Sequence, residues 1–153
     1  MKNVFGKDEK RIKHAFAVLG YSKKIHQSED GDNFVITAAA ILHDIGIHEA
    51  EKKYASPAGR YQEIEGPPIA RRILKKYNVD EQEIEHICKI IANHHSARDI
   101  DTIEFRIIWD SDWLVNLAEE ADHRGKNELA EMINKRFKTT CGKQLALGIY
   151  TKE

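Results

Sequence analysis

Two imidazoles and two carboxylates occupy positions where helical periodicity places apolar side chains. His14 opens a row with spacings of four, three and four residues, which continues through Val18, Tyr21 and Ile25. Asp112 stands inside a second row, with spacings of three, four and three, formed by Phe105, Ile108 and Val115. His43 and Asp44 follow directly on the most apolar run of the chain. A polar side chain at such a position must find a partner, because burying a bare charge is costly.

Together these four side chains make a suitable ligand set for a divalent metal ion. Nitrogen and oxygen ligands in this mixture suit Mn, Fe, Co, Ni, Zn or Mg, and they leave positions for water or a phosphate oxygen. Thiolate ligands are not indicated, because Cys88 and Cys141 lie far apart; we expect Cys88 to be a core thiol. The alternative is a salt-bridge network in which the acids and imidazoles satisfy one another without a metal.

Helices must position these residues, because the apolar pattern repeats near 3.6 residues and no alternating strand pattern occurs. We predict an all-α fold with helices over about 8–26, 34–44, 66–77, 80–95, 102–121 and 124–137, and a final turn through Leu145 and Leu147. Two capping boxes support the helix starts, namely Asp80 with Glu83 and Asp101 with Glu104.

The segment between the second and third of these helices has a different pattern. Gly46 is expected to stop the apolar helix, and the residues from Ile47 to Glu65 are expected to form a long polar loop. The sequence Gly66-Pro67-Pro68 is expected to start the next helix. A loop of this length in a small domain indicates either a functional role or disorder.

Length and charge limit the remaining possibilities. A chain of 153 residues and 17.6 kDa predicts one domain over residues 1–153, with a core over about 8–121 and a C-terminal helical extension over about 124–149. A net charge of −1 gives no nucleic-acid footprint, and no apolar run is long enough to cross a membrane. The sparse cysteines and the polar N-terminus favour the cytoplasm.

These residues and their order resemble the HD-domain superfamily of metal-dependent phosphohydrolases. Members have a His on the first helix, a His-Asp pair that ends an apolar helix, often as LHDIG, and a later Asp in a segment like a-D-x-L. The matching residues are His14 in RIKHAFAVLGYSKKI, His43 and Asp44 in AAAILHDIG, and Asp112 in IIWDSDWLVNL. The resemblance spans roughly residues 11–120.

The resemblance implies an all-α bundle of at least five helices around a metal site. It also implies hydrolysis of a phosphomonoester or phosphodiester of a nucleotide or similar small phosphorylated metabolite. About one divalent ion per chain is expected, with His14, His43, Asp44 and Asp112 as its ligands. Asp44 would orient the attacking water, and His94 or His95 would stabilise the phosphoryl group or protonate the leaving oxygen. A second ion is conceivable near His94 and His95.

Two positions depart from the family pattern. Members with two metals have a His where this chain has Gln62, and some branches have Lys or an acidic residue where it has Ile47. The cyclic dinucleotide phosphodiesterase branch is therefore not indicated. Glu63 and Glu65 could supply a base in place of an acid at position 47, or could be ordinary loop or cap residues.

The remaining expectations concern substrate and alternatives. Lys53 and Arg60, in the polar segment, are the cations expected to contact outer phosphates, unless they are simply solvated. The alternative function is a non-catalytic regulatory module that binds a metal or a nucleotide without turnover. A purely structural helical protein is the third possibility. The sequence leaves homo-oligomerisation open.

Overall fold

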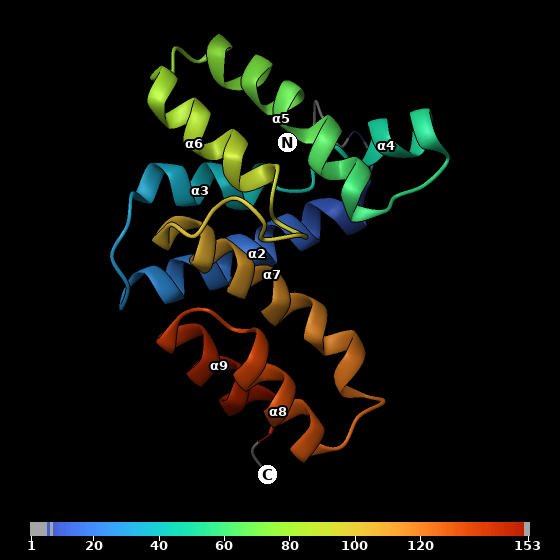
Figure 1. The fold of residues 1–153 in the computed structure, drawn as a ribbon, viewed down its shortest axis with the longest axis vertical. Helices are drawn as coiled ribbons and strands as arrows, with labels where there is room; N and C mark the ends of the chain where they lie inside the picture. Colours follow the sequence, from blue (N-terminus) through green and yellow to red (C-terminus); the bar gives the residue numbers. More distant parts are fainter. Residues whose placement is uncertain (1–5, 7, 152–153) are drawn as a thin grey trace.

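Helices make up all the regular structure of the part of the chain that the computed structural model describes, residue 6 and residues 8–151 (Figure 1). The prediction of an all-α fold is confirmed. The elements are α2 (Glu9–His26), α3 (Asn33–Leu42), α4 (Ile47–Tyr54), α5 (Gly59–Lys76), α6 (Glu81–Ile91), α7 (Ile103–Ala121), α8 (Lys126–Arg136) and α9 (Thr140–Tyr150).

The apolar helix α3 lies at the centre of the fold. It packs against α2 and α7 on one side and against α6 on another, while α5 and α6 pair with each other (Figure 1). Four of its residues are almost completely buried: Val35, Ile36, Ala39 and Ala40. Burying a side chain the size of Ile36 contributes about 1.5–3 kcal/mol, so this contact anchors α3 and fixes the turn that follows it.

Short polar side chains begin the helices around the site. The carboxylate of Asp32 accepts hydrogen bonds from two backbone N–H groups at the start of α3, and that of Asp80 accepts one, from the N–H of Gln82, at the start of α6. The start of α7 differs from the expected capping box, because the Thr102 hydroxyl is the cap. Asp101 instead binds the guanidinium of Arg106 through both carboxylate oxygens.

The expected polar loop over 47–65 is wrong. Most of this segment is helical, as the end residues of α4 and α5 show, and Pro67 and Pro68 lie inside α5 rather than at its start. The backbone at Gly46 packs directly against the backbone at Gly66, because a Cβ on Gly46 would lie only 2.6 Å from the backbone nitrogen of Gly66. Glycine here permits two backbones to touch, and this tertiary contact outweighs the weak local preference of Gly and Pro for a helix break.

The C-terminal helices α8 and α9 pack on each other and α9 packs on α7. Asp110 of α7 fixes this arrangement, because its buried carboxylate accepts hydrogen bonds from the backbone N–H groups of Lys138 and Thr139 and from the Thr139 hydroxyl. The spacing of four residues between Arg106 and Asp110 is typical of a surface ion pair, but Arg106 binds Asp101 and Asp110 is buried. The expected final turn is the full helix α9. In the described ranges, no helix combines the length and apolar character needed to cross a membrane.

Candidate metal centre

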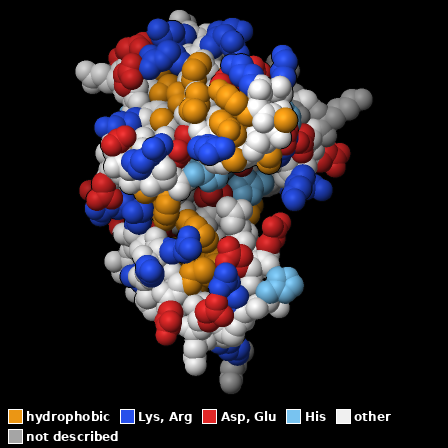
Figure 2. All heavy atoms as spheres, turned by 45° about the vertical axis from the view of Figure 1, so that its right-hand side comes forward, with side chains coloured by type: hydrophobic (Ala, Val, Ile, Leu, Met, Phe, Trp, Pro, Cys, Tyr) orange, Lys and Arg blue, Asp and Glu red, His pale blue; other side chains and the backbone are white. Residues whose placement is uncertain are grey.

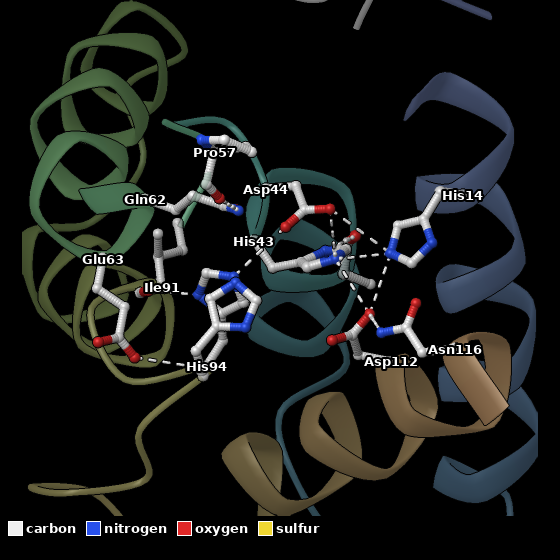
Figure 3. A network of polar contacts seen from close by, with 12 residues as sticks. His14, His43, Asp44, Pro57, Gln62, Glu63, Ile91, His94, Asp112 and Asn116 are labelled. Atoms are coloured by element: carbon white, nitrogen blue, oxygen red, sulfur yellow. Dashed lines mark hydrogen bonds and ion pairs between the residues drawn. The ribbon is translucent and has the colours of Figure 1, made fainter. Parts of the chain in front are cut away.

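Residues far apart in sequence meet between α2, α3 and α7 (Figure 3). His14 comes from α2, His43 and Asp44 from the turn that follows α3, and Asp112 from α7. The two imidazole Nε2 atoms of His14 and His43 are 3.2 Å apart. Asp112 Oδ1 lies 3.0 Å from His14 Nε2 and 3.7 Å from His43 Nε2. Thus the four residues expected from the sequence come together in one place.

Asp44 connects this group to a second one. Its Oδ2 atom lies 3.5 Å from His14 Nε2 and 3.4 Å from His43 Nε2, while its Oδ1 atom lies 3.4 Å from His94 Nε2. The ligand atoms of His14, His43 and Asp112 all lie within 4.8 Å of one another, as do those of Asp44, His94 and His95. Either set could hold a metal ion, and Asp44 faces both.

Backbone carbonyls orient two of the imidazoles. The Nδ1 atom of His43 lies 2.9 Å from the carbonyl oxygen of Ala40, and that of His94 lies 2.7 Å from the carbonyl oxygen of Ile91. A carbonyl oxygen only accepts, so Nδ1 carries the proton in each ring. In the neutral form, Nε2 of each ring therefore presents a lone pair to the centre, which is the form that binds a metal.

The charges of the centre suit a cation. Burial by itself would lower the pKa of His43, but Asp44 and Asp112 raise it well above its usual range. Burial would likewise raise the pKa of Asp44, yet His43 and His94 hold it well below the usual range. The pKa of Asp112 is also lowered, against its burial, by hydrogen bonds from His14 and His43. Two ionised carboxylates therefore face the imidazoles, and a cation would replace the protons that the imidazoles hold.

The segment after α6 places His95 at the edge of the second group. Its ring packs against Gly59, where a Cβ would come within 2.6 Å of the imidazole. The surrounding protein atoms and the neighbouring His94 lower the pKa of His95 to about 4, although its ring is reachable from solvent. The buried carboxylate of Glu63 accepts hydrogen bonds from the backbone N–H groups of His95 and Ser96. Glu63 therefore acts as a cap that orders this segment.

The two cations expected at the phosphate are engaged with other groups. Lys53 lies on α4, not in a loop, and its Nζ is 2.6 Å from Glu65 Oε2 and 3.5 Å from Glu49 Oε1. Arg60 lies in the first turn of α5, with its guanidinium over the ring of Tyr61 and a hydrogen bond to the Tyr61 hydroxyl. Their role in binding phosphate stays a prediction.

Two amide side chains lie at the centre; reasoning from the sequence missed Asn116 and named Gln62 only as a departure from the family pattern. Asn116 donates a hydrogen bond to Asp112 Oδ1, a contact that the spacing of four residues on one helix could have suggested. Gln62, buried on α5, donates from Nε2 to the carbonyl oxygen of Pro57 at 2.7 Å. Its Oε1 and the Nε2 of His94 are buried and accept no hydrogen bond from the described residues.

The donor set therefore fits a divalent metal ion. Buried acceptors need a hydrogen-bond donor or a cation, and a salt-bridge network confined to these residues leaves Gln62 Oε1 unmatched. The neutral imidazole nitrogens and carboxylate oxygens are ligands that suit Mn, Fe, Co, Ni or Zn, and the carboxylates also suit Mg.

Comparison with known proteins decides the family. The HD domain model matches residues 11–136. The chain belongs to the HD domain family. This HD domain is similar in fold to the crystal structure of a predicted HD superfamily hydrolase from an uncultured Thermotogales bacterium, with a TM-score of 0.69 and 21% sequence identity, over 98% of this chain and 80% of that chain. No curated protein sequence matches the chain.

Proposed function

We propose that this HD-domain protein is a metal-dependent phosphohydrolase that cleaves a phosphomonoester or phosphodiester. The observation that carries the proposal is the convergence of His14, His43, Asp44 and Asp112 on one point, with the Nδ1 proton of His43 fixed by a backbone carbonyl. Membership of the HD family and the fold of a predicted HD superfamily hydrolase support it.

Some of these residues would bind the metal ions, and others would orient the attacking water and accept its proton. His14, His43, Asp44 and Asp112 would hold one divalent ion, and Asp44 with His94 and His95 offers a place for a second. A bound ion supplies Lewis acidity, which lowers the pKa of water and neutralises charge on a phosphoryl oxygen. Asp44 would orient the attacking water. Where no second ion is bound, His94 Nε2 would accept a proton from that water, because the carbonyl oxygen of Ile91 holds the proton on Nδ1.

The surface around the centre suits a small anionic substrate. Figure 2 shows histidine and acidic side chains gathered in a hollow at the waist of the molecule, with lysine and arginine side chains close by. His14 and Asp44 keep about a fifth of their side-chain surface exposed, at 20% and 18%, so a ligand can reach them. We therefore propose a nucleotide or a similar small phosphorylated metabolite as substrate, with the protein acting in the cytoplasm.

A metal and substrate screen tests this proposal. The purified protein is stripped with a chelator and titrated calorimetrically with Mn²⁺, Co²⁺, Ni²⁺, Zn²⁺ and Mg²⁺. Each loaded form is then assayed for phosphate release from a panel of nucleotides, p-nitrophenyl phosphate and bis-p-nitrophenyl phosphate. We expect binding tighter than about millimolar and turnover of at least one phosphoester. An absence of metal binding at that level would overturn the metal centre.

The regulatory alternative makes a different prediction. Ile47 begins α4 and packs against the apolar core, so this position supplies no acid or cation to the centre. A non-catalytic module would bind the metal and a nucleotide but release no phosphate from any member of the panel. The turnover measurement therefore separates the two functions.

A further inference from the structure

Glu63 joins α5 to the segment that carries the second group of candidate ligands. Its carboxylate is buried, and Oε1 accepts hydrogen bonds from the backbone N–H groups of His95 at 3.0 Å and Ser96 at 2.8 Å. Figure 3 shows its side chain extending from α5 toward the segment that carries His94. The other oxygen, Oε2, lies 3.6 Å from Nη2 of Arg98. One carboxylate therefore spans the backbone of His95 and the guanidinium of Arg98.

The segment between α6 and α7 forms a compact turn that fixes the main chain around Arg98. The backbone oxygen of Asn93 accepts hydrogen bonds from the N–H groups of Ser96 and Ala97. Its side-chain oxygen accepts one from the N–H of Asp99. The main chain on both sides of Arg98 is thus held to the end of α6, which keeps the guanidinium close to the second group of ligands.

The guanidinium of Arg98 faces solvent. Its side chain is 70% exposed, whereas that of Glu63 is 4% exposed, so the cation and not the carboxylate meets a ligand. The separation of 3.6 Å between them is longer than an N–H···O hydrogen bond, so the donors of the guanidinium remain available. Lys53 and Arg60 differ, because each hydrogen-bonds to a neighbouring side chain. Arg98 is therefore better placed than either to bind an anion that reaches the centre.

We propose that Arg98 binds a second phosphate group of the substrate, next to the phosphate that is cleaved. The cleaved phosphate would lie at the candidate metal ligands. Arg98 follows the last of these ligands, His95, by three residues, and the shared carboxylate of Glu63 sets it at the outer edge of the second group. A planar guanidinium matches phosphate oxygens, which it can bind through two parallel hydrogen bonds.

This assignment specifies the class of substrate. It rests on the proposed phosphohydrolase function, and it favours a phosphate ester that carries a diphosphate, such as a nucleoside diphosphate, over an ester with a single phosphate. Neutralising the charge of the second phosphate would strengthen binding of the diphosphate and leave binding of the monophosphate unchanged.

The test compares Arg98→Leu and Arg98→Lys with wild type, as full chains loaded with Mn²⁺ and freed of excess metal. Leucine removes the charge, whereas lysine keeps the charge without the planar fork. The matched control is Arg72→Leu, at an exposed arginine of α5. Each protein is titrated calorimetrically with methylenediphosphonate, which has two phosphorus atoms and resists hydrolysis, and with methylphosphonate, which has one. Bound Mn²⁺ is measured after each titration, and the thermal midpoint is measured without metal.

We expect Arg98→Leu to bind methylenediphosphonate at least about tenfold more weakly than wild type, the lower end of what a hydrogen bond to a charged group contributes. Its affinity for methylphosphonate, its bound Mn²⁺ and its thermal midpoint should match wild type, because the exposed pair with Glu63 contributes little to stability. Arg98→Lys should lie between wild type and Arg98→Leu. The Arg72→Leu control should bind both phosphonates as wild type does.

Several results would overturn the inference. Wild-type affinity of Arg98→Leu for methylenediphosphonate would show that Arg98 does not contact the second phosphorus group, as would a failure of wild type to bind this compound. An equal loss of affinity for both phosphonates would place Arg98 at the cleaved phosphate. A lower thermal midpoint with loss of bound Mn²⁺ would make Arg98 structural.

Failure of the proposed function gives a different result. Wild type would then bind methylenediphosphonate in a manner that depends on Arg98 but release no phosphate from any phosphoester of the panel. That outcome would keep the assignment of Arg98 to a second phosphate and would replace hydrolysis by binding without turnover.

Discussion

Asn116 donates a hydrogen bond from Nδ2 to Oδ1 of Asp112, one helical turn earlier on α7, at 3.0 Å. The same oxygen lies 3.0 Å from His14 Nε2, so the amide fixes the atom that faces the imidazoles. Asn116 is exposed and sits at the rim of the centre. Its effect on the chemistry would therefore act through the position of Asp112.

Replacement of Asn116 by Ala should weaken metal binding by about tenfold, since loss of a group that orients a metal ligand typically costs 10–100-fold in affinity and this one is exposed. Alanine favours a helix more than asparagine does, so the metal-free thermal midpoint should not fall. Calorimetric titration with Mn²⁺ measures the affinity. Asn127→Ala, at an exposed asparagine of α8, is the control. Unchanged affinity in Asn116→Ala would show that Asp112 needs no such support.

Asp110 and Asp112 should give opposite phenotypes. Asp112→Ala is expected to lose bound metal and activity together, because Asp112 Oδ1 faces His14 and His43. Asp110→Ala is expected to keep bound metal and at least about a tenth of the activity, since Asp110 holds α9 and not the centre. Its cost should be a lower free energy of unfolding, by about 1–3 kcal/mol, from the backbone N–H groups left without an acceptor.

Metal analysis, turnover and chemical denaturation of these two variants give the three readouts. If Asp110→Ala lost its metal while Asp112→Ala retained it, the assignment of ligands on α7 would be wrong. An equal loss of stability in both variants would show that Asp112 also supports the fold.

The double change of His43 and Asp44 to Ala should abolish phosphoester hydrolysis and metal binding. Both residues lie in the turn after α3, so the buried face of α3 remains and the helical circular-dichroism signal should persist. Wild type should gain about 2.7 kcal/mol of stability when the metal is present at 100 times its dissociation constant, and the variant should gain none. Thermal scans with and without Mn²⁺ measure this difference. Activity surviving the double change would place the chemistry elsewhere.

The Cys88 thiol should react slowly with thiol reagents. Burial raises its pKa, and its Sγ lies 3.5 Å from the carbonyl oxygen of Pro67. A raised pKa means less thiolate at a given pH, so modification of Cys88 should keep accelerating above about pH 8.5, the usual midpoint of a free thiol. The Cys141→Ser variant leaves Cys88 as the single thiol, and its rate of reaction with Ellman's reagent is followed from pH 7 to 10. The same variant in denaturant is the control, and equal pH profiles in both states would contradict the prediction.

The residues of the centre were largely predictable because they are polar side chains at helix positions where the periodicity predicts apolar ones. His14 and Asp112 interrupt apolar rows, and a polar side chain in such a row has few stable solutions other than pairing or metal binding. Residues two apart on a helix point in nearly opposite directions, so Asp110 and Asp112 cannot both face the centre. The ligand roles of these residues stay predictions until metal binding is measured.

The sequence was misleading where tertiary contacts outweigh local preference. Gly66, Pro67 and Pro68 favour a helix start, yet they lie inside α5 because Gly66 allows the chain at Gly46 to pack directly on it. Arg106 could pair with Asp110 four residues later, but its guanidinium binds Asp101 instead. The Asp110 carboxylate accepts hydrogen bonds from the backbone N–H groups of Lys138 and Thr139, which lie 28 and 29 residues further along the chain.

The sequence by itself determined the all-α fold and the positions of the polar residues on otherwise apolar helix faces, because helical periodicity and the cost of burying charge act along a single segment. Only the tertiary structure decided that Asp44 faces two groups of ligands and that Gln62 lies buried beside the centre with an unmatched oxygen. These relations join α3, α5 and α6, and hydrogen-bond partners distant in sequence leave no periodic signal in any one of them.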